Sequence, residues 1–351
     1  MRPELFFSEA VNQKASDIYI VEGKPLSLKV SGRIVPLSDT NLTSEATEAI
    51  LREMYQLANR DFGRMDHGDD DFALAMPTGR FRVNAYMQQQ SYASVIRTIP
   101  ISIPDYKKLN IPDVIMGLAN YHRGIVLFTG TTGSGKSTAL ACVIDKINKE
   151  RQAHIVTVED PIEYRHSHKQ SIVSQRELEG DTQTYLSALR AAMRQVPDVI
   201  LVGEMRDQET ISAAITAAET GHLVFSTLHT IGAGPTVDRI IDVFPADQQS
   251  QVRTQLSTTL QAVISQQLIP TVDGKLTPAH EIMIVNSAIR NLIREGKTFQ
   301  IENTLQTSAA AGMKTMDMSI FELAKRGVIS RENALQYSVN QPVMTQRLGA
   351  R

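Results

Sequence analysis

The segment GTTGSGKS, residues 130–137, constrains this chain more than any other stretch. It follows the short apolar run Ile125–Phe128 and precedes a helix-patterned stretch, ALACVIDKINKE. A phosphate-binding P-loop requires this order of strand, glycine-rich loop and helix, because backbone N–H groups of the loop must close around phosphate oxygens at a helix N-terminus. The segment therefore predicts a strand, loop and helix that bind the phosphates of ATP.

Each residue of this loop has an expected role. Lys136 would reach the β- and γ-phosphates, and the Ser137 hydroxyl would bind Mg²⁺. The other residues expected to contact nucleotide are Gly130, Thr131, Thr132, Gly133, Ser134, Gly135 and Thr138. The alternative is a glycine-rich turn without a ligand, which the flanking strand and helix patterns disfavour.

Carboxylates follow two other apolar runs, and hydrolysis needs carboxylates near the metal ion and the attacking water. DVILVGEMRD places Glu204 after four aliphatic residues, the position of a Walker B acid. HIVTVEDPIEY places Glu159, Asp160 and Glu163 at the end of another run, which Pro161 would stop. Ligands bind such sheets beyond the carboxyl ends of the strands, so these acids are candidates for chemistry. Their alternative role is to cap helices or face solvent.

The stretch ETGHLVFSTLHT, residues 219–230, holds a histidine on each side of an apolar run. If the run is a core strand, His229 and Thr230 follow its carboxyl end and reach the expected γ-phosphate position, while His222 lies at the other end. His229 is therefore a candidate γ-phosphate sensor. Either histidine could instead be an ordinary structural residue.

Sequence patterns divide the chain into regions. Residues 1–99 show short alternating runs and one helix-patterned stretch, 40–59, which predicts a small α+β domain. Residues 100–112 contain three prolines and are predicted to link two domains. Residues 113–285 alternate short apolar runs with helix patterns, which is typical of a parallel α/β sheet covered on both faces. Residues 286–351 are predicted to be helical.

Arginines gather on one face of a predicted strand in the first region. In GRFRVNAYM, alternation places Arg80, Arg82 and Asn84 on one face, and a second strand, SYASVIRTI, adds Arg97. Guanidinium groups suit phosphate through bidentate contacts. The pattern alone favours ordinary surface arginines, so a role at the nucleotide needs other support.

Composition excludes several classes of protein. The chain has 351 residues, with 36 basic and 38 acidic side chains and a net charge of −2, which disfavours nucleic acid as the main ligand. Cys142 is the only cysteine, so a disulfide framework and a cysteine zinc site are excluded. No window reaches the roughly 18 consecutive apolar residues of a membrane-spanning helix. We therefore expect a cytoplasmic protein that reaches a membrane only through a partner.

Several segments together resemble one known family. GTTGSGKST, VEDPIEY, PDVILVGEMRDQETISAAITAAETGHLVFSTLHT and AIRNLIRE resemble the secretion ATPase superfamily that powers type IV pili and type II secretion. AIRNLIREGK, residues 288–297, is similar to the motif associated with its pilus retraction ATPases. The resemblance implies a PAS-like N-terminal domain, a RecA-like P-loop ATPase domain with a helical C-terminal region, and a homohexamer that binds ATP and Mg²⁺ between the two domains.

The same resemblance implies roles for single residues. Glu163 would activate the attacking water, and Glu204 would hold Mg²⁺ directly or through water. His222 and His229 match the histidine box of the family. The family also uses arginines of its N-terminal domain to contact nucleotide. The arginines on the matching strands of this chain are Arg80, Arg82 and Arg97.

The retraction motif has a second interpretation. Its apolar residues, Ala288, Ile289, Leu292 and Ile293, form a stripe at helical spacing. The residues left free to face outward are Arg290, Arg294 and Glu295. A plain amphipathic helix would show the same pattern, so only the literal match favours a function. The chain departs from the usual family pattern at Tyr19, Gln195 and Val196, and none of these is a catalytic position.

The leading hypothesis is a hexameric, Mg²⁺-dependent ATPase that couples hydrolysis to interdomain motion and drives type IV pilus retraction. It would pull on an inner-membrane platform protein of the pilus. One alternative is an accessory ATP-binding subunit that docks on another retraction ATPase. Others are a pilus assembly or type II secretion ATPase, which the lack of a four-cysteine motif disfavours, and a nucleic-acid motor, which the charge disfavours.

Overall fold

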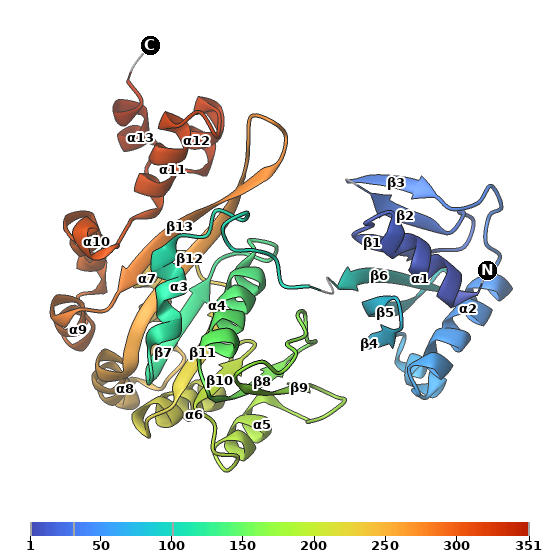
Figure 1. Ribbon diagram of the computed structural model, residues 1–351, viewed down its shortest axis with the longest axis horizontal. Helices are drawn as coiled ribbons and strands as arrows, with labels where there is room; N and C mark the ends of the chain where they lie inside the picture. Colours follow the sequence, from blue (N-terminus) through green and yellow to red (C-terminus); the bar gives the residue numbers. More distant parts are fainter. Residues whose placement is uncertain (1, 31, 100–101, 350–351) are drawn as a thin grey trace. The chain divides into compact units, whose positions relative to one another are not determined.

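The computed structural model describes residues 2–30, 32–99 and 102–349, so positions 100–101 of the predicted linker lie outside the described residues. The chain forms two compact units, Met1–Ser102 and Ile103–Arg351, each considered by itself (Figure 1). The rest of the predicted linker packs onto the second unit: Ile111 is buried there, and the Cys142 thiol donates a hydrogen bond to the carbonyl of Pro104.

Within residues 2–30 and 32–99, the first unit is a six-stranded antiparallel sheet with helices packed on it. The strand order is β3-β2-β1-β6-β5-β4. The strands are β1 (Asp17–Ile20), β2 (Ser27–Val30), β3 (Arg33–Pro36), β4 (Asp69–Met76), β5 (Gly79–Gln88) and β6 (Ser91–Ile99). The helices are α1 (Pro3–Asn12), α2 (Ser44–Leu57) and the 3₁₀ helix η1 (Phe62–His67).

This unit has the predicted mixture of helix and strand. Helix α2 falls inside the predicted stretch 40–59, and the Thr43 hydroxyl caps it by accepting a hydrogen bond from the Ala46 N–H. In β5, Phe81 and Val83 are fully buried, whereas Arg82 lies on the opposite, partly exposed face. The alternation read from the sequence is therefore correct, and the α+β class of this unit is confirmed. That it is PAS-like stays a prediction.

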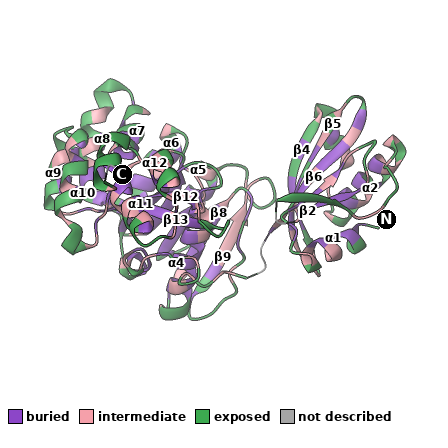
Figure 2. Cartoon of the chain, turned by 90° about the horizontal axis from the view of Figure 1, so that it is seen from above, coloured by how far each residue is buried: buried purple, intermediate pink, exposed green. Residues whose placement is uncertain are grey.

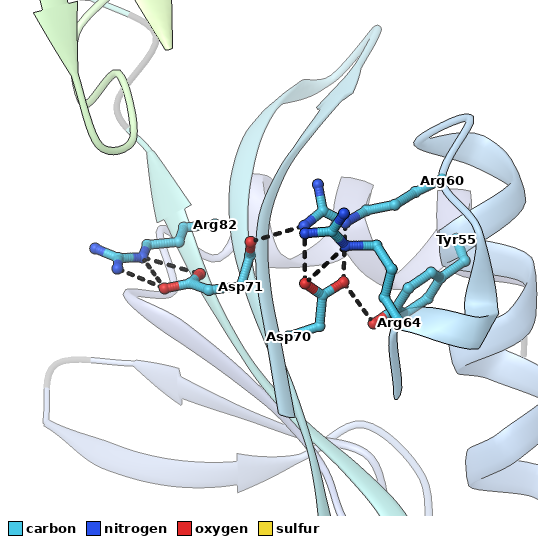
Figure 3. A network of polar contacts seen from close by, with 6 residues as sticks. All are labelled: Tyr55, Arg60, Arg64, Asp70, Asp71 and Arg82. Carbon is cyan, nitrogen blue, oxygen red and sulfur yellow. Dashed lines mark hydrogen bonds and ion pairs between the residues drawn. The ribbon is translucent and has the colours of Figure 1, made fainter. Parts of the chain in front are cut away.

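A buried carboxylate, Asp70, ties β4 to the helical side of the first unit (Figure 3). Its oxygens accept hydrogen bonds from Arg60 at 2.8 Å and from the Tyr55 hydroxyl at 2.9 Å, and Arg64 lies 3.4 Å away. Burial raises the pKa of Asp70, but the hydrogen bonds from Arg60 and Tyr55 outweigh it and hold the pKa below its ordinary value. The next residue, Asp71, faces the other way and pairs with Arg82 at 3.0 Å.

We predict that Asp70→Ala lowers the free energy of unfolding of the first unit by about 3 kcal/mol or more, because it removes the carboxylate acceptor shared by the partly buried Arg60 guanidinium and the buried Tyr55 hydroxyl. Asp71→Ala is the matched control, since it breaks an exposed ion pair and should cost less than about 1 kcal/mol. Urea unfolding of the full chain would measure both changes. Equal effects of the two substitutions would contradict this account of Asp70.

Within residues 102–349, the second unit contains a seven-stranded sheet of order β13-β12-β7-β11-β10-β8-β9. All neighbours in it are parallel except the β12–β13 pair. The strands are β7 (Gly124–Thr129), β8 (His154–Glu159), β9 (Ile172–Glu177), β10 (Val199–Val202), β11 (Leu223–Leu228), β12 (Leu260–Pro270) and β13 (Leu276–Ile284). The predicted parallel sheet is present, and the antiparallel hairpin β12–β13 is an addition that the sequence patterns did not indicate.

Helices cover both faces of this sheet (Figure 1). One face packs on α3 (Asp113–Met116), η2 (Gly117–Asn120) and α4 (Lys136–Glu150). The other packs on α5 (Tyr185–Ala192), α6 (Gln208–Glu219), α7 (Ala233–Asp242) and α8 (Ala246–Thr259). Neighbouring strand residues alternate between the two cores: Val126 belongs to the first and Leu127 to the second. The central strands are fully buried, while the edge strand β9 is only partly buried (pink in Figure 2).

The described residues after β13 form helices and turns, as predicted. They comprise α9 (Ser287–Arg294), η3 (Thr298–Gln300), α10 (Ile301–Thr307), η4 (Ala309–Ala311), α11 (Met316–Lys325), α12 (Arg331–Tyr337) and α13 (Gln341–Arg347). The last predicted positions, 350–351, lie outside the described residues. No helix in the described part of the chain is both long and apolar enough to cross a membrane.

Two predictions about the retraction motif, which lies mainly in α9, were wrong. Ile289 and Ile293 are buried as expected, but Ala288 is exposed and does not belong to the apolar stripe. Arg290 does not face freely outward, because its Nη1 donates hydrogen bonds to the carbonyls of Ser257 at 2.6 Å and Thr258 at 2.8 Å. These carbonyls lie at the C-terminal end of α8, where a cation also suits the helix dipole. Arg290 therefore joins α9 to α8.

Candidate nucleotide site

The P-loop runs from the end of β7 to the start of α4. All six residues of β7 are buried, and α4 begins at Lys136. The Lys136 ammonium group donates hydrogen bonds to the carbonyls of Gly130 at 2.7 Å and Thr131 at 2.8 Å. Burial lowers the pKa of Lys136, while the negative charges of Glu204 and Glu163 act to raise it. Lys136 is therefore within electrostatic reach of the two predicted acids.

Close packing from β12 explains two of the loop glycines. Gly130 has a φ of +136°, and a Cβ there would lie 2.2 Å from the carbonyl oxygen of Gln266. Gly135 has a φ of +87°, and its Cβ would lie 2.7 Å from Gln266 Nε2. That amide group donates a hydrogen bond to the carbonyl of Ser134 at 2.7 Å. The loop conformation therefore depends on a buried glutamine from β12, a strand that is distant in sequence but lies beside β7.

The role of Gln266 is not evident from the sequence. This residue lies about 130 residues after the P-loop, and only the pairing of β12 beside β7 brings it there. The one signal available was the polar stretch Ser265–Gln267 within the mainly apolar run AVISQQLIP. The side chains of Gln266 and Gln267 point to opposite faces of β12, and Gln267 donates instead to the carbonyl of Tyr337 at 3.1 Å.

We predict that Gln266→Leu weakens ADP binding about tenfold, because the buried Ser134 carbonyl loses its donor and the loop loses its support. Gln267→Leu is the matched control and should leave ADP affinity unchanged. Calorimetric titration of each purified variant with ADP gives the dissociation constants. If Gln266→Leu binds ADP like the unsubstituted protein, Gln266 does not shape the loop.

Glu204 and His229 meet beside the P-loop. Glu204 follows β10 and is 15% exposed; its Oε2 pairs with Arg206 at 2.7 Å, and its Oε1 lies 3.3 Å from His229 Nε2. The other ring nitrogen of His229 lies 3.4 Å from the Thr132 hydroxyl of the P-loop. Burial raises the pKa of Glu204, but the hydrogen bond from Arg206 and the charges of His229 and Arg206 outweigh it and lower the pKa. His229 thus connects the acid to the phosphate loop.

The acidic segment, residues 159–166, begins with the last residue of β8 and lies against the start of α4. The Tyr164 hydroxyl, which is buried, is 2.9 Å from the Thr138 hydroxyl of α4. Glu163 is exposed, and Glu159, the last residue of β8, accepts hydrogen bonds from the Thr157 hydroxyl at 2.7 Å and from Gln175 Nε2 at 3.2 Å. Burial raises the pKa of Glu159 to about 7, although both hydrogen bonds act to lower it. The segment therefore combines the exposed carboxylate of Glu163 with that of Glu159, whose pKa is raised.

We predict that Glu159→Gln stabilises the protein increasingly as the pH rises from about 5 to 8. The pKa of Glu159 is about 7 in the folded state, against an ordinary value of 4.5. Between these two pH values the folded state binds more protons than the unfolded state, so the glutamate lowers the stability of the protein as the pH rises. The glutamine mimics the protonated acid and keeps an oxygen for both donors. The difference in Tm between variant and wild type should grow with pH; a difference independent of pH would contradict the raised pKa.

Not every predicted residue lies at the edge of the sheet that carries the P-loop. His222 precedes β11 at its amino end, with its Nδ1 2.9 Å from the carbonyl oxygen of Ala217 and 3.2 Å from the Thr220 hydroxyl at the end of α6. Within its own chain, His222 therefore contacts the C-terminal end of α6 and does not reach the P-loop. Thr230 follows β11, but its hydroxyl contacts that of Thr236 in α7 at 2.7 Å.

The predicted arginines belong to the other compact unit. Arg80 and Arg82 lie on β5, where Arg82 pairs with Asp71, and Arg97 on β6 pairs with Asp17 at 3.2 Å. Their role at the nucleotide stays a prediction.

The residues at this edge fit a nucleotide with Mg²⁺. The Ser134 hydroxyl is buried inside the loop without a partner among the described residues, and the Ser137 hydroxyl stands at the first turn of α4. No group of three or more metal-binding side chains occurs in the described part of the chain. Mg²⁺ is commonly held by one or two protein groups together with phosphate oxygens, so Ser137 and Glu204 suit this kind of ion without forming a cage.

Comparison with known proteins decides the family. The family of type II/IV secretion system proteins matches residues 4–341. The chain belongs to this family. It is 46% identical over 327 residues to the type IV pilus retraction ATPase PilT of Pseudomonas aeruginosa, covering 93% of this chain and 94% of that protein. It is also 52% identical over 277 residues to a twitching motility protein of Neisseria gonorrhoeae, covering 78% and 74% of the two chains.

A solved structure supports the same assignment. The crystal structure of the pilus retraction motor PilT with bound ADP has a TM-score of 0.90 and 43% identity, and the match covers 99% of both chains. These similarities confirm the resemblance inferred from the motifs, the RecA-like ATPase fold with its helical C-terminal region, and the prediction of a P-loop ATPase related to the pilus retraction ATPases.

Proposed function

We propose that this protein hydrolyses ATP to drive type IV pilus retraction, as a homohexamer that uses Mg²⁺. One observation carries the chemistry: Lys136, Glu204 and His229 meet at the carboxyl edge of a parallel sheet, each next to a different strand. The similarity to PilT, over nearly the whole of both chains, supports the biological task.

The geometry suggests a division of work among the residues. Lys136 would exchange its two carbonyl partners for phosphate oxygens, which are stronger acceptors because they are charged. Ser137 and Glu204 would hold Mg²⁺, which offsets the negative charge of the triphosphate when bound. Glu163, exposed and close enough to influence Lys136, would accept a proton from the attacking water.

His229 is suited to report the state of the γ-phosphate. It lies between Thr132 of the P-loop and Glu204, so a shift of either partner changes its contacts. Arg206 pairs with the same carboxylate and would keep it oriented. Because the chain continues from the end of β11 through Thr230 to α7, a movement of His229 can pass to the helices beyond it.

Assembly extends the proposal beyond this one chain. In the hexamer, Arg80, Arg82 and Arg97 of the first unit would contact nucleotide, and His222 would act at a site other than its own P-loop. The motor would remain cytoplasmic, reach the inner membrane through the pilus machinery and pull on a platform protein there. Nucleic acid is not proposed as a partner, in keeping with the net charge of −2.

The catalytic assignment predicts distinct defects in purified protein. Lys136→Ala and Glu204→Ala should each reduce ATP turnover at least about 100-fold, because the first removes a positive charge that stabilises the transition state and the second removes a carboxylate that would hold Mg²⁺. Glu163→Gln should lose turnover to a similar degree but keep ATP affinity, because it removes only the base. Phosphate release and binding of fluorescent ATP measure the two properties. Turnover like that of wild type in Lys136→Ala or Glu204→Ala would overturn the ATPase site.

An accessory subunit is the second candidate, and one comparison favours keeping it. The chain is 41% identical over 331 residues to the type IV pilus ATPase PilU of Pseudomonas aeruginosa, only slightly less than to PilT. Expression in cells that lack every other retraction ATPase but keep the pilus assembly ATPase separates the two. Restored retraction and surface motility support a motor, whereas retraction only beside a second ATPase supports an accessory subunit.

A further inference from the structure

Strand β9 runs beside the acidic segment that carries Glu163. It is the edge strand of the second unit, parallel to β8, with Gln175 opposite Thr157 and Glu177 opposite Glu159. Gln175 and Glu177 are two residues apart, so their side chains point to the same face of the sheet. Val173 shares that face and packs in the core that also contains α4.

The side chain of Gln175 makes three hydrogen bonds to the acidic segment. Its Nε2 donates to the Tyr164 carbonyl at 2.9 Å and to Glu159 Oε1 at 3.2 Å. Its Oε1 accepts from the His166 N–H at 2.7 Å. One amide group therefore binds the segment both before and after Glu163.

Glu177 and Tyr164 complete the arrangement. Glu177 Oε2 accepts a hydrogen bond from the Ile162 N–H at 3.1 Å, and the Tyr164 hydroxyl contacts Thr138 in the helix that follows the P-loop. The backbone on each side of Glu163 is thus held by a side chain from β9, at the Ile162 N–H and at the Tyr164 carbonyl. The carboxylate of Glu163 itself stays exposed, as a group that must meet substrate requires.

We propose that Gln175 is a positioning residue for ATP hydrolysis, which fixes the acidic segment so that the Glu163 carboxylate is held beside the P-loop. This inference rests on the proposed role of Glu163 as the base. Gln175 contacts neither the P-loop nor any group assigned to nucleotide binding in the described residues, so its loss affects the chemical step and leaves nucleotide affinity intact.

The test uses the full-length protein with Gln175→Met, which keeps the length of the side chain and removes its donor and acceptor. The kcat for ATP should fall about 10- to 100-fold, while the Kd for ADP stays within about twofold of wild type. Gln249→Met is the matched control, because Gln249 is also a partly buried glutamine that donates to a backbone carbonyl, that of Phe244 at 3.1 Å. It should leave both values unchanged.

A double-mutant cycle separates positioning from general destabilisation. If Gln175 acts through Glu163, Gln175→Met should reduce the residual turnover of Glu163→Gln by less than about twofold. Should Gln175→Met fail to fold, Gln175→Leu, which has a shorter apolar side chain and likewise lacks the donor and the acceptor, is used in the same cycle.

Three results would overturn the inference. The first is a kcat like that of wild type in the Gln175 variant, and the second is a loss of the same size in both backgrounds. The third is ADP affinity that falls in parallel with kcat, which would make Gln175 a binding residue. Full turnover in the single variant Glu163→Gln would instead show that Glu163 is not the base. Failure of that proposed role can therefore be told apart from failure of the Gln175 proposal.

Discussion

The parallel register of four neighbouring strands is the constraint on which the site depends. β7, β11, β10 and β8 run in the same direction, so the residues that follow them meet at one edge of the sheet. The P-loop, His229, Glu204 and the acidic segment each follow a different one of these strands. No single segment could place a lysine, a histidine and two acids together, but the sheet does so because its parallel strands end at the same edge.

Desolvation gives this arrangement its electrostatic character. Lys136 is only 7% exposed and needs acceptors, which two loop carbonyls provide, while Glu204 and Glu163 oppose the effect of burial on its pKa. Glu204 in turn is held by Arg206 and His229. Each charged group therefore depends on its neighbours, which makes the site responsive to the arrival of a highly charged triphosphate.

Local patterns predicted the parts of the protein that local residues determine. The apolar runs, the glycine-rich loop and the acids after strand ends were evident in the sequence, because each is written in consecutive residues. Gln266 and Gln175 were not, since their importance comes from the pairing of distant strands in a particular register. His222 and Arg290 likewise showed their helix-end contacts only in the fold, since these contacts depend on how the chain turns back.

The central claim is that the loop around Lys136 binds the triphosphate and that the acids beside it act on it. A structure of the protein with Mg²⁺ and a non-hydrolysable ATP analogue tests this most directly. The account predicts that the Lys136 ammonium leaves the carbonyls of Gly130 and Thr131 and contacts the phosphates, with Glu204 facing the metal ion. An analogue bound elsewhere, with Lys136 still on those two carbonyls, would contradict it.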